Sequence, residues 1–253
     1  MPFALFNKKC TMPEGPSIVI LTKAVKAFKG KKVVAANGNA KIDLQRLQNQ
    51  KVVDFKTWGK HFLICFKTFT IRIHLLMFGS YSINEQKDRP ARLSLVFENC
   101  ELNFYTCSVQ FIDIPLNEVY DWSADVMSDA WDAKAARKKL KQEPETLVCD
   151  ALLNQNIFAG VGNIIKNEVL FRIKVHPATK VGDLPPRKLT ELINEARNYS
   201  FDFLEWKKAF ELKNHWLAYS KKTCPRDGTK LTKQHLGKTK RRTFYCETCQ
   251  VKY

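Results

Sequence analysis

Cysteines near the C-terminus are spaced as the ligands of a metal ion. Cys246 and Cys249 form a CxxC pair, and Cys224 begins a similar segment in which Asp227 stands where a second cysteine would be. Three sulfurs and one carboxylate can hold Zn²⁺ in tetrahedral coordination, and such an ion stabilises a hairpin too small for a core of its own. The pattern therefore predicts one structural zinc ion bound by Cys224, Asp227, Cys246 and Cys249.

His235 competes with Asp227 for the fourth ligand position. If residues 229–235 pair with residues 241–246 as a hairpin, His235 falls near the tip, whereas the cysteines lie at the opposite end. We therefore favour Asp227 as the ligand. A metal-free hairpin with reduced cysteines is the alternative interpretation.

Pro13 and Glu14 follow an internal methionine and have the chemistry of a nucleophile with a proton carrier. A free α-amine titrates near pH ~8, so a useful fraction of a free proline amine is unprotonated at neutral pH. Its attack on a sugar carbon gives an iminium directly, and a neighbouring carboxyl can donate and accept the proton. With residues 1–11 attached, the Pro13 nitrogen is an amide, so this chemistry requires translation from Met12 or removal of the extension. As internal residues the pair would be only a helix start.

Two other segments carry residue types that grip phosphate. Basic residues crowd the proposed hairpin tip, where Arg241 and Arg242 can offer a rigid fork of donors, although a solvated basic surface is the plain interpretation. Residues 159–163 read Ala-Gly-Val-Gly-Asn and precede a helical run, so Asn163 is expected to be an N-cap. The helix N-terminus and this amide can also hold a DNA phosphate.

The charge balance favours an anionic partner. The chain has 253 residues, with 42 Lys and Arg against 25 Asp and Glu and a net charge of +17, which suits nucleic acid or a membrane surface. No apolar run is long enough to span a membrane, and the first residues do not have the pattern of a signal peptide. Cys65 and Cys149 read as buried thiols of a reducing compartment. We therefore expect an intracellular protein, cytoplasmic or nuclear.

The elements that must position these residues follow from hydrophobic spacing. Apolar residues from Ile18 to Phe28 recur at helical spacing, and residues 33–114 read as strands and hairpins typical of an antiparallel β-sandwich. Residues 119–132 lack strand character and read as a linker. Residues 133–220 read as helical, with Leu189, Ile193 and Ala196 on one face, and residues 221–253 form the basic tail. The fold class is thus α+β.

Five segments together resemble the formamidopyrimidine-DNA glycosylase and endonuclease VIII family. They are Met-Pro-Glu-Gly-Pro at 12–16, Gly-Lys-His at 59–61, His-Leu-Leu-Met-Phe-Gly at 74–79, the stretch 152–168, and residues 241–250. The opening Glu-Gly-Pro looks more like the endonuclease VIII branch. The resemblance implies a catalytic β-sandwich over 13–118, a helix–two-turn–helix DNA-binding domain over 133–220 and a zinc-finger hairpin over 221–253. Residues 1–12 are then an extension or a mis-assigned start.

The resemblance also implies roles for single residues. Pro13 matches the nucleophile on the sugar of the damaged nucleotide, Glu14 the acid and base, and Lys60 the lysine that holds the phosphate beside the lesion. Met77 matches a wedge that fills the gap left by the flipped base. The phosphate grips of the C-terminal elements correspond to Asn163 and Arg241, with Arg242 as the neighbour that can replace Arg241. Glu168 matches an acid that supports the second helix.

The sequence departs from the family at three places. Ser17 stands where the family usually has a second Glu, and Asp227 replaces a zinc cysteine. The family's arginine and phenylalanine wedge loop would fall at Thr106 to Phe111, which reads Thr-Cys-Ser-Val-Gln-Phe. The preference for the opposite base is therefore expected to differ.

These features predict a bifunctional DNA glycosylase and abasic-site lyase of base excision repair. The resemblance implies that it excises oxidised bases, pyrimidines favoured, from damaged duplex DNA through a proline Schiff base, and that it nicks the strand by β,δ-elimination. We expect a monomer that needs no nucleotide or redox cofactor. The alternatives are a catalytically inactive homologue that binds damaged DNA and, less favoured, an RNA-binding protein.

Overall fold

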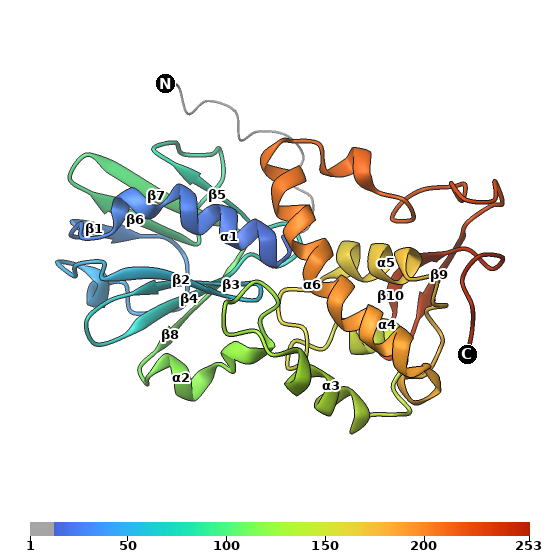
Figure 1. Ribbon diagram of the computed structural model, residues 1–253. Coiled ribbons are helices and arrows are strands. Elements are labelled where there is room, and N and C mark those ends of the chain that lie inside the picture. The colour runs from blue at the N-terminus through green and yellow to red at the C-terminus, as the bar shows by residue number, and fades with distance from the viewer. Residues whose placement is uncertain (1–12) are drawn as a thin grey trace. The chain divides into compact units, whose positions relative to one another are not determined.

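The chain forms two compact units, residues 1–120 and 121–253. The computed structural model describes residues 13–253, so the predicted extension, residues 1–12, lies outside the described residues. Figure 1 labels the elements of both units. The finer domain bounds given above stay predictions.

The first unit consists of one helix and two four-stranded sheets. Helix α1 (Gly15–Ala24) is followed by the short turns η1 (Lys26–Phe28) and η2 (Gln45–Leu47), and α2 (Leu116–Val119) ends the unit. The strands are β1 (Ala35–Asn37), β2 (Asp54–Trp58), β3 (His61–Cys65), β4 (Thr70–His74), β5 (Ser80–Ile83), β6 (Leu93–Phe97), β7 (Cys100–Tyr105) and β8 (Ser108–Ile112). Their order is β1-β6-β7-β5 in one sheet and β2-β3-β4-β8 in the other, and neighbours are antiparallel.

The two sheets share one core. Phe62 of β3 and Phe104 of β7 are fully buried, and their ring centroids lie 5.7 Å apart although they belong to different sheets. Helix α1 adds Ile18 and Leu21 to the same cluster. The expected antiparallel β-sandwich with a leading helix is thereby confirmed.

The second unit is helical and ends in a hairpin. Its helices are α3 (Ala133–Lys141), α4 (Val148–Ala151), α5 (Asn163–Arg172) and α6 (Pro186–Lys208), with short turns η3 (Trp122–Ala124), η4 (Val181–Asp183) and η5 (Leu212–His215). Strands β9 (Thr232–Leu236) and β10 (Arg241–Tyr245) pair antiparallel. In the part of the chain that the structure describes, no helix is long and apolar enough to cross a membrane.

Helix α5 is the centre of the second unit. Every residue from Asn163 to Phe171 is buried, and the helix packs against both α6 and β10. Helix α6 turns a single apolar face inward, and the three residues predicted for that face, Leu189, Ile193 and Ala196, are buried. The amphipathic helix α6 thus packs its apolar face against α5, which is buried on all sides.

Candidate active site and nucleic-acid interface

Lys60 lies in a two-residue turn at one end of the second sheet. The turn joins β2 to β3 and pairs Trp58 with His61. Gly59 has a φ of 53°, which suits the first central residue of a tight hairpin turn. Without a Cβ at this position the chain can reverse in two residues, so Lys60 is held at the sheet end instead of on a long loop.

Met77 lies on the loop that leaves the same end of that sheet. His61 of β3 pairs with His74 of β4, so the Lys60 turn and residues 75–79 start from adjacent strand ends. Met77 is 44% exposed and its neighbour Phe78 is 70% exposed. The structure thus places Lys60 and Met77, two site residues predicted from the sequence, at the same end of the second sheet. The exposed aromatic residue Phe78 lies beside Met77.

Two histidines beside Lys60 are kept neutral. Burial, together with the positive charges of Arg72 and Lys60, lowers the pKa of His61 to about 4. Burial and the charge of Lys60 also lower the pKa of His74. The His61 ring lies 3.2 Å from the Tyr120 hydroxyl through Nδ1. This sheet end is therefore electropositive through Lys60 and Arg72 and not through its imidazoles, a local field suited to an anion.

Pro13 and Glu14 precede α1, which begins at Gly15 with Glu14 as its N-cap. The expected helix start is thus shifted by two residues. Glu14 is 1% exposed, and its amide donates to the Ser17 hydroxyl at 3.3 Å. Ser17, the departure from the family pattern, therefore completes a capping box with Glu14. Helix α1 packs on β2 and β3, the strands joined by the Lys60 turn.

Asn163 is the first residue of α5 and not its N-cap. Gly162 takes the N-cap position, so the N-cap expectation for Asn163 is wrong. Gly162 adopts the extended backbone conformation that an N-cap needs. The Asn163 side chain is directed toward the hairpin instead of capping the helix. Its Nδ2 donates to the Arg242 carbonyl at 3.0 Å, while its Oδ1 is buried without a hydrogen-bond partner among the described residues. The second hydrogen on Nδ2 is available for another acceptor.

The hairpin that carries Arg241 and Arg242 is fixed to α5 and α4 by buried polar groups. Asn167 of α5 accepts the Phe244 amide at 2.7 Å, and Lys166 donates to the Thr243 hydroxyl at 2.8 Å. These contacts hold β10 along α5 close to its N-terminus. They bring Asn163 and the backbone of Arg242, two predicted phosphate grips, into direct contact.

Asp150 of α4 holds the turn between β9 and β10. Its carboxylate accepts the amides of Lys238 at 2.8 Å and Thr239 at 3.2 Å, and the Thr239 hydroxyl at 2.8 Å. Gly237 adopts a φ of +71°, and a Cβ on it would lie 2.2 Å from the Asp150 carboxylate. Sequence reasoning missed Asp150, because a single acid in a short helix gives no signal.

Glu168 has a structural role. Its fully buried carboxylate accepts the amides of Leu217 at 2.9 Å, Ala218 at 3.0 Å and Tyr219 at 2.7 Å. Burial raises the pKa of Glu168, and the three amides oppose that shift. The carboxylate thereby fixes the chain that leads from α6 to the hairpin.

The predicted metal ligands meet at the base of the hairpin. The ligand atoms of Cys224, Asp227, Cys246 and Cys249 all lie within 4.8 Å of one another. Tetrahedral zinc with bonds of about 2.3 Å to sulfur requires sulfurs about 3.8 Å apart. The sulfurs of Cys224 and Cys249 are 3.8 Å apart. The four residues therefore fit a zinc ion.

Asp227 completes the cluster, and His235 does not belong to it. His235 pairs with Arg242 near the tip and contacts the Lys240 carbonyl at 2.8 Å. Hydrogen bonds from the Thr229 side chain and amide hold the pKa of Asp227 well below its usual range, so its side chain is an ionised carboxylate at neutral pH. The hairpin register thus decides between the two candidates as expected.

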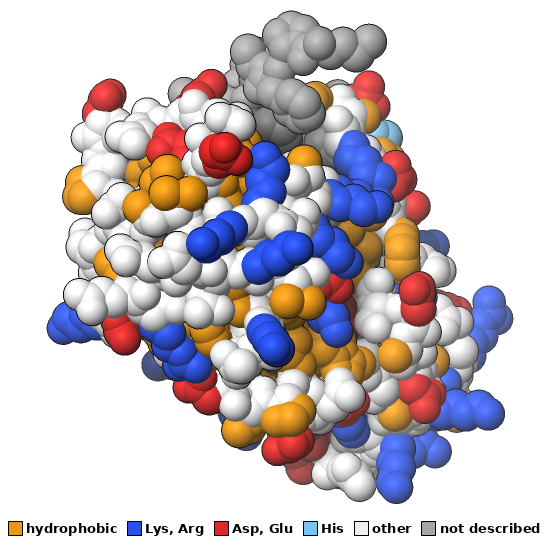
Figure 2. Space-filling view, turned by 90° about the vertical axis from the view of Figure 1, so that its left-hand side faces the viewer, with side chains coloured by type: hydrophobic (Ala, Val, Ile, Leu, Met, Phe, Trp, Pro, Cys, Tyr) orange, Lys and Arg blue, Asp and Glu red, His pale blue; other side chains and the backbone are white. Residues whose placement is uncertain are grey.

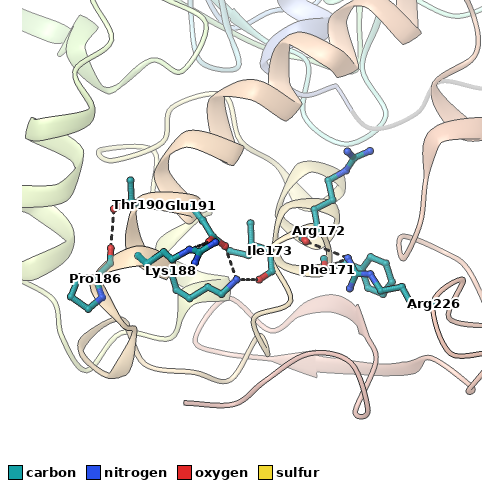
Figure 3. A network of polar contacts seen from close by, with 9 residues as sticks. Phe171, Arg172, Ile173, Pro186, Lys188, Thr190, Glu191 and Arg226 are labelled. Carbon is teal, nitrogen blue, oxygen red and sulfur yellow. Dashed lines mark hydrogen bonds and ion pairs between the residues drawn. The ribbon is translucent and has the colours of Figure 1, made fainter.

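Arg226 connects the metal cluster to the C-terminal end of α5. It donates to the Phe171 carbonyl at 2.8 Å and to the Arg172 carbonyl at 3.2 Å, and it lies 3.4 Å from the Cys249 sulfur. Lys188 donates to the next carbonyl, that of Ile173, at 2.7 Å. Figure 3 shows these cations grouped at the end of α5, where they satisfy carbonyls that the helix leaves open.

Two family models match the chain in the order of its units. The formamidopyrimidine-DNA glycosylase N-terminal domain matches residues 12–113, and the formamidopyrimidine-DNA glycosylase H2TH domain matches residues 123–204. The chain belongs to the formamidopyrimidine-DNA glycosylase and endonuclease VIII family. The helix–two-turn–helix prediction for the second unit is confirmed by the second match.

Curated relatives of the family have endonuclease VIII-type names. Endonuclease 8-like 3 of Bos taurus is 32% identical over 231 residues, which cover 85% of this chain and 37% of that protein. The chain therefore spans little more than a third of the length of that relative. The DNA-(apurinic or apyrimidinic site) lyase Nei2 of Mycolicibacterium smegmatis is 25% identical over 95% of this chain and 99% of its own length.

Solved glycosylase structures share the fold. Formamidopyrimidine-DNA glycosylase of Lactococcus lactis, non-covalently bound to DNA containing an abasic site, has a TM-score of 0.83 at 20% identity and covers 94% of this chain and 100% of its own. A viral DNA glycosylase has a TM-score of 0.81 at 22% identity, with the same coverage.

The segment expected to differ from the family's wedge loop forms a corner between the sheets. Strand β7 ends at Tyr105 and β8 begins at Ser108, so only Thr106 and Cys107 connect them. Phe111 lies within β8, and its ring packs edge-on against Phe69 at 5.2 Å. Two connecting residues cannot form a probe, so the apolar groups exposed at this sheet end are those of residues 76–78.

Proposed function

We propose that this member of the family is a bifunctional DNA glycosylase and abasic-site lyase whose nucleophile is the amine of Pro13. One observation carries the proposal: the match to the catalytic domain begins at Met12, so Pro13 is its second residue. In a chain that starts at Met12, removal of the methionine leaves proline as the N-terminus. Glu14 follows it directly and is buried at the start of α1.

The reaction we propose uses groups of this chain alone. The Pro13 nitrogen attacks C1′ of the damaged nucleotide, and the base leaves with the electrons of the glycosidic bond. Glu14 accepts the proton that the proline nitrogen loses on attack and donates it to the ring oxygen of the sugar, so the ring opens and leaves an iminium between the proline and the sugar. Loss of the proton next to the iminium carbon then expels the 3′ phosphate, and a second elimination expels the 5′ phosphate.

The remaining site residues position DNA in this scheme. Lys60 at its hairpin turn binds the phosphate beside the lesion, and Met77 fills the space left by the flipped base. Asn163 binds a second phosphate together with Arg241, and Arg242 lies next to that grip. We infer damaged duplex DNA as the substrate, with oxidised pyrimidines favoured, a monomeric enzyme, no nucleotide cofactor, and action in the cytoplasm or nucleus.

We propose that zinc is the metal of the Cys224, Asp227, Cys246 and Cys249 cluster. Sulfur and carboxylate donors at tetrahedral spacing support this assignment. The bound ion would supply a rigid base for the hairpin and no chemistry at the sugar. Arg226 donates to the Cys249 sulfur at 3.4 Å, next to the proposed ion.

A second candidate function is damage binding without catalysis. The observation that favours it is that twelve residues precede Pro13 in this sequence, and with them its nitrogen is an amide. Such a protein keeps Asn163 and Arg241 as DNA contacts. It would not form a covalent bond to DNA.

Borohydride trapping on DNA with an abasic site tests the proposal. Protein that begins at Pro13 should be trapped covalently, whereas the 253-residue chain and Pro13→Gly in the shortened protein should give no more than traces. Intact mass of the protein from its own cell shows which N-terminus is used. Binding of the abasic DNA without trapping by the shortened protein would refute the lyase and leave the binding function.

A further inference from the structure

We propose that the exposed face of α3 is a phosphate-binding surface that takes the backbone of double-stranded DNA, in addition to the grips named above. Lys134, Lys138 and Lys141 are exposed and follow one another at spacings of four and three residues. Residues at these spacings lie on one side of a helix. Arg137 joins them, and the four cations line one surface hollow whose other lining residue is Gln142.

The lysines of this face are not matched by acids. Among the residues that the structure describes, Lys134, Lys138 and Lys141 make no ion pair, whereas Lys188 and Lys208 of α6 pair with Glu191 and Glu205. The acids next to α3 are engaged elsewhere. Asp132 caps the helix, Glu143 accepts the Thr146 hydroxyl at 3.4 Å, and Glu145 pairs with Lys180.

Stability of the helix does not account for the cluster. Cations in the last turn favour a helix dipole, but Lys134 lies in the first turn, where a cation is unfavourable. Like charges three and four residues apart repel, and α3 contains no acid to offset them. The buried side of the helix, Ala136 and Leu140, would hold it in place with neutral residues outside. The repulsion is relieved when an anion is bound.

The hollow suits a row of phosphates better than other anionic partners. Seven residues of helix rise about 10.5 Å, and phosphates of one DNA strand succeed one another every ~3.4 Å along the axis. The three lysines therefore span about three phosphates. Arg137 is held by a hydrogen bond to the Thr190 hydroxyl at 2.6 Å, so its guanidinium has a fixed place at the centre of the row. All residues of the lining are polar, so the surface lacks the apolar anchors of a membrane-binding helix.

Helix α3 is also tied to the segment that leads into α5. Lys139, which is not among the residues that line the hollow, donates to the Asn156 carbonyl at 2.7 Å and pairs with Asp121 at 2.7 Å. Asn156 lies in the connection that ends at Asn163. DNA held by α3 would thus be bound by the same unit as the Asn163 grip. Figure 2 shows one face of the molecule, on which lysine and arginine side chains, in blue, lie among hydrophobic and acidic ones.

The test compares two variants that lose the same charge. The first variant, Lys134→Gln, Lys138→Gln and Lys141→Gln, removes the three lysine charges of the α3 face and keeps the charge of Arg137. The control, Lys41→Gln, Lys51→Gln and Lys67→Gln, removes three exposed lysines of the first unit. Binding to an undamaged 40-base-pair duplex is measured over a range of salt concentrations, so the readout does not depend on Pro13 chemistry.

The α3 variant should lose about eightfold in affinity at 0.1 M salt for each lysine that contacts a phosphate, and its salt slope should fall by about 0.9 per contact. Its melting temperature should not fall, since repulsion within the helix is removed. Equal losses in both variants, or no loss in the α3 variant, would overturn the proposal. Loss of binding to polyglutamate with unchanged DNA binding would assign the face to an acidic protein instead. This inference rests on the proposed DNA-binding role. Covalent trapping of the shortened protein on a 13-base-pair abasic duplex is therefore measured in parallel. If the protein is not trapped, that result counts against the lyase activity alone.

Discussion

Replacement of Asp150 should loosen the hairpin that carries Arg241 and Arg242. The Asp150 carboxylate accepts three hydrogen bonds of 2.8–3.2 Å from the turn at Lys238 and Thr239. A donor that loses a charged partner costs about 1–3 kcal/mol. Lys238 and Thr239 are exposed, so water replaces part of each lost hydrogen bond. The cost of each of the three bonds therefore lies at the lower end of this range, about 1 kcal/mol. Asp150→Ala should therefore destabilise the turn by about 2–3 kcal/mol.

This free energy corresponds to a roughly 30- to 150-fold increase in local opening. Hydrogen exchange followed by mass spectrometry over residues 232–245 measures it directly, because opening of the turn exposes the β9–β10 amides. Asp150→Asn keeps one acceptor and should show about a third of the free-energy change. Affinity for abasic DNA should fall in the same order, since Arg241 follows the turn directly.

The matched control is Asp129→Ala, which removes an exposed acid from the same unit. Its exchange at residues 232–245 should equal that of the unchanged protein. Exchange within twofold of the control in Asp150→Ala would refute the reasoning. So would equal increases in exchange throughout the second unit, because they would indicate global destabilisation.

Other consequences of the structure are open to measurement. Glu168→Gln should lower the free energy of unfolding by about 2–3 kcal/mol in denaturant titrations, because an amide group cannot accept all three backbone amides; an unchanged value would contradict the role given to this carboxylate. Asp227→Ala should weaken metal binding, measured by zinc release to a chromogenic chelator, far more than His235→Ala; equal effects would favour His235 as ligand. His61 has a folded pKa of about 4 against about 6.5 unfolded, so between these values only the unfolded chain binds the proton. Stability should therefore fall by up to about 3 kcal/mol as the pH drops from 6.5 to 4, and His61→Gln should flatten this dependence.

The sequence was sufficient for features governed by local pattern. The apolar run of residues 62–66 predicted a strand, and the helical spacing of Leu189 and Ile193 predicted a buried helix face; the structure confirms both. The metal cluster was predictable because the register of one short hairpin decides whether Asp227 or His235 lies near Cys246. Such features depend on residues close together in the chain.

Contacts between distant segments could not be predicted in this way. Asp150 and Thr239 are 89 positions apart, and Asn167 reaches Phe244 across 77 positions. The sequence spacing of neither pair predicts the contact, because the contact forms only when α4 and α5 pack against the hairpin. The same packing determines the role of Asn163. Its side chain donates to the Arg242 carbonyl, while Gly162 is the N-cap of the helix.

The buried polar residues of α5 have a consequence for the order in which the protein is made. Lys166, Asn167 and Glu168 each have a hydrogen-bond partner within residues 217–244, which are synthesised after α5. Until then these side chains keep their hydrogen bonds only if water reaches them, because burying them unpaired is costly. The nascent helical region must therefore remain open around α5, and it can close only after residue 244 has been synthesised. The sandwich has all of its strands by Ile112, so it can fold while the second unit is still emerging.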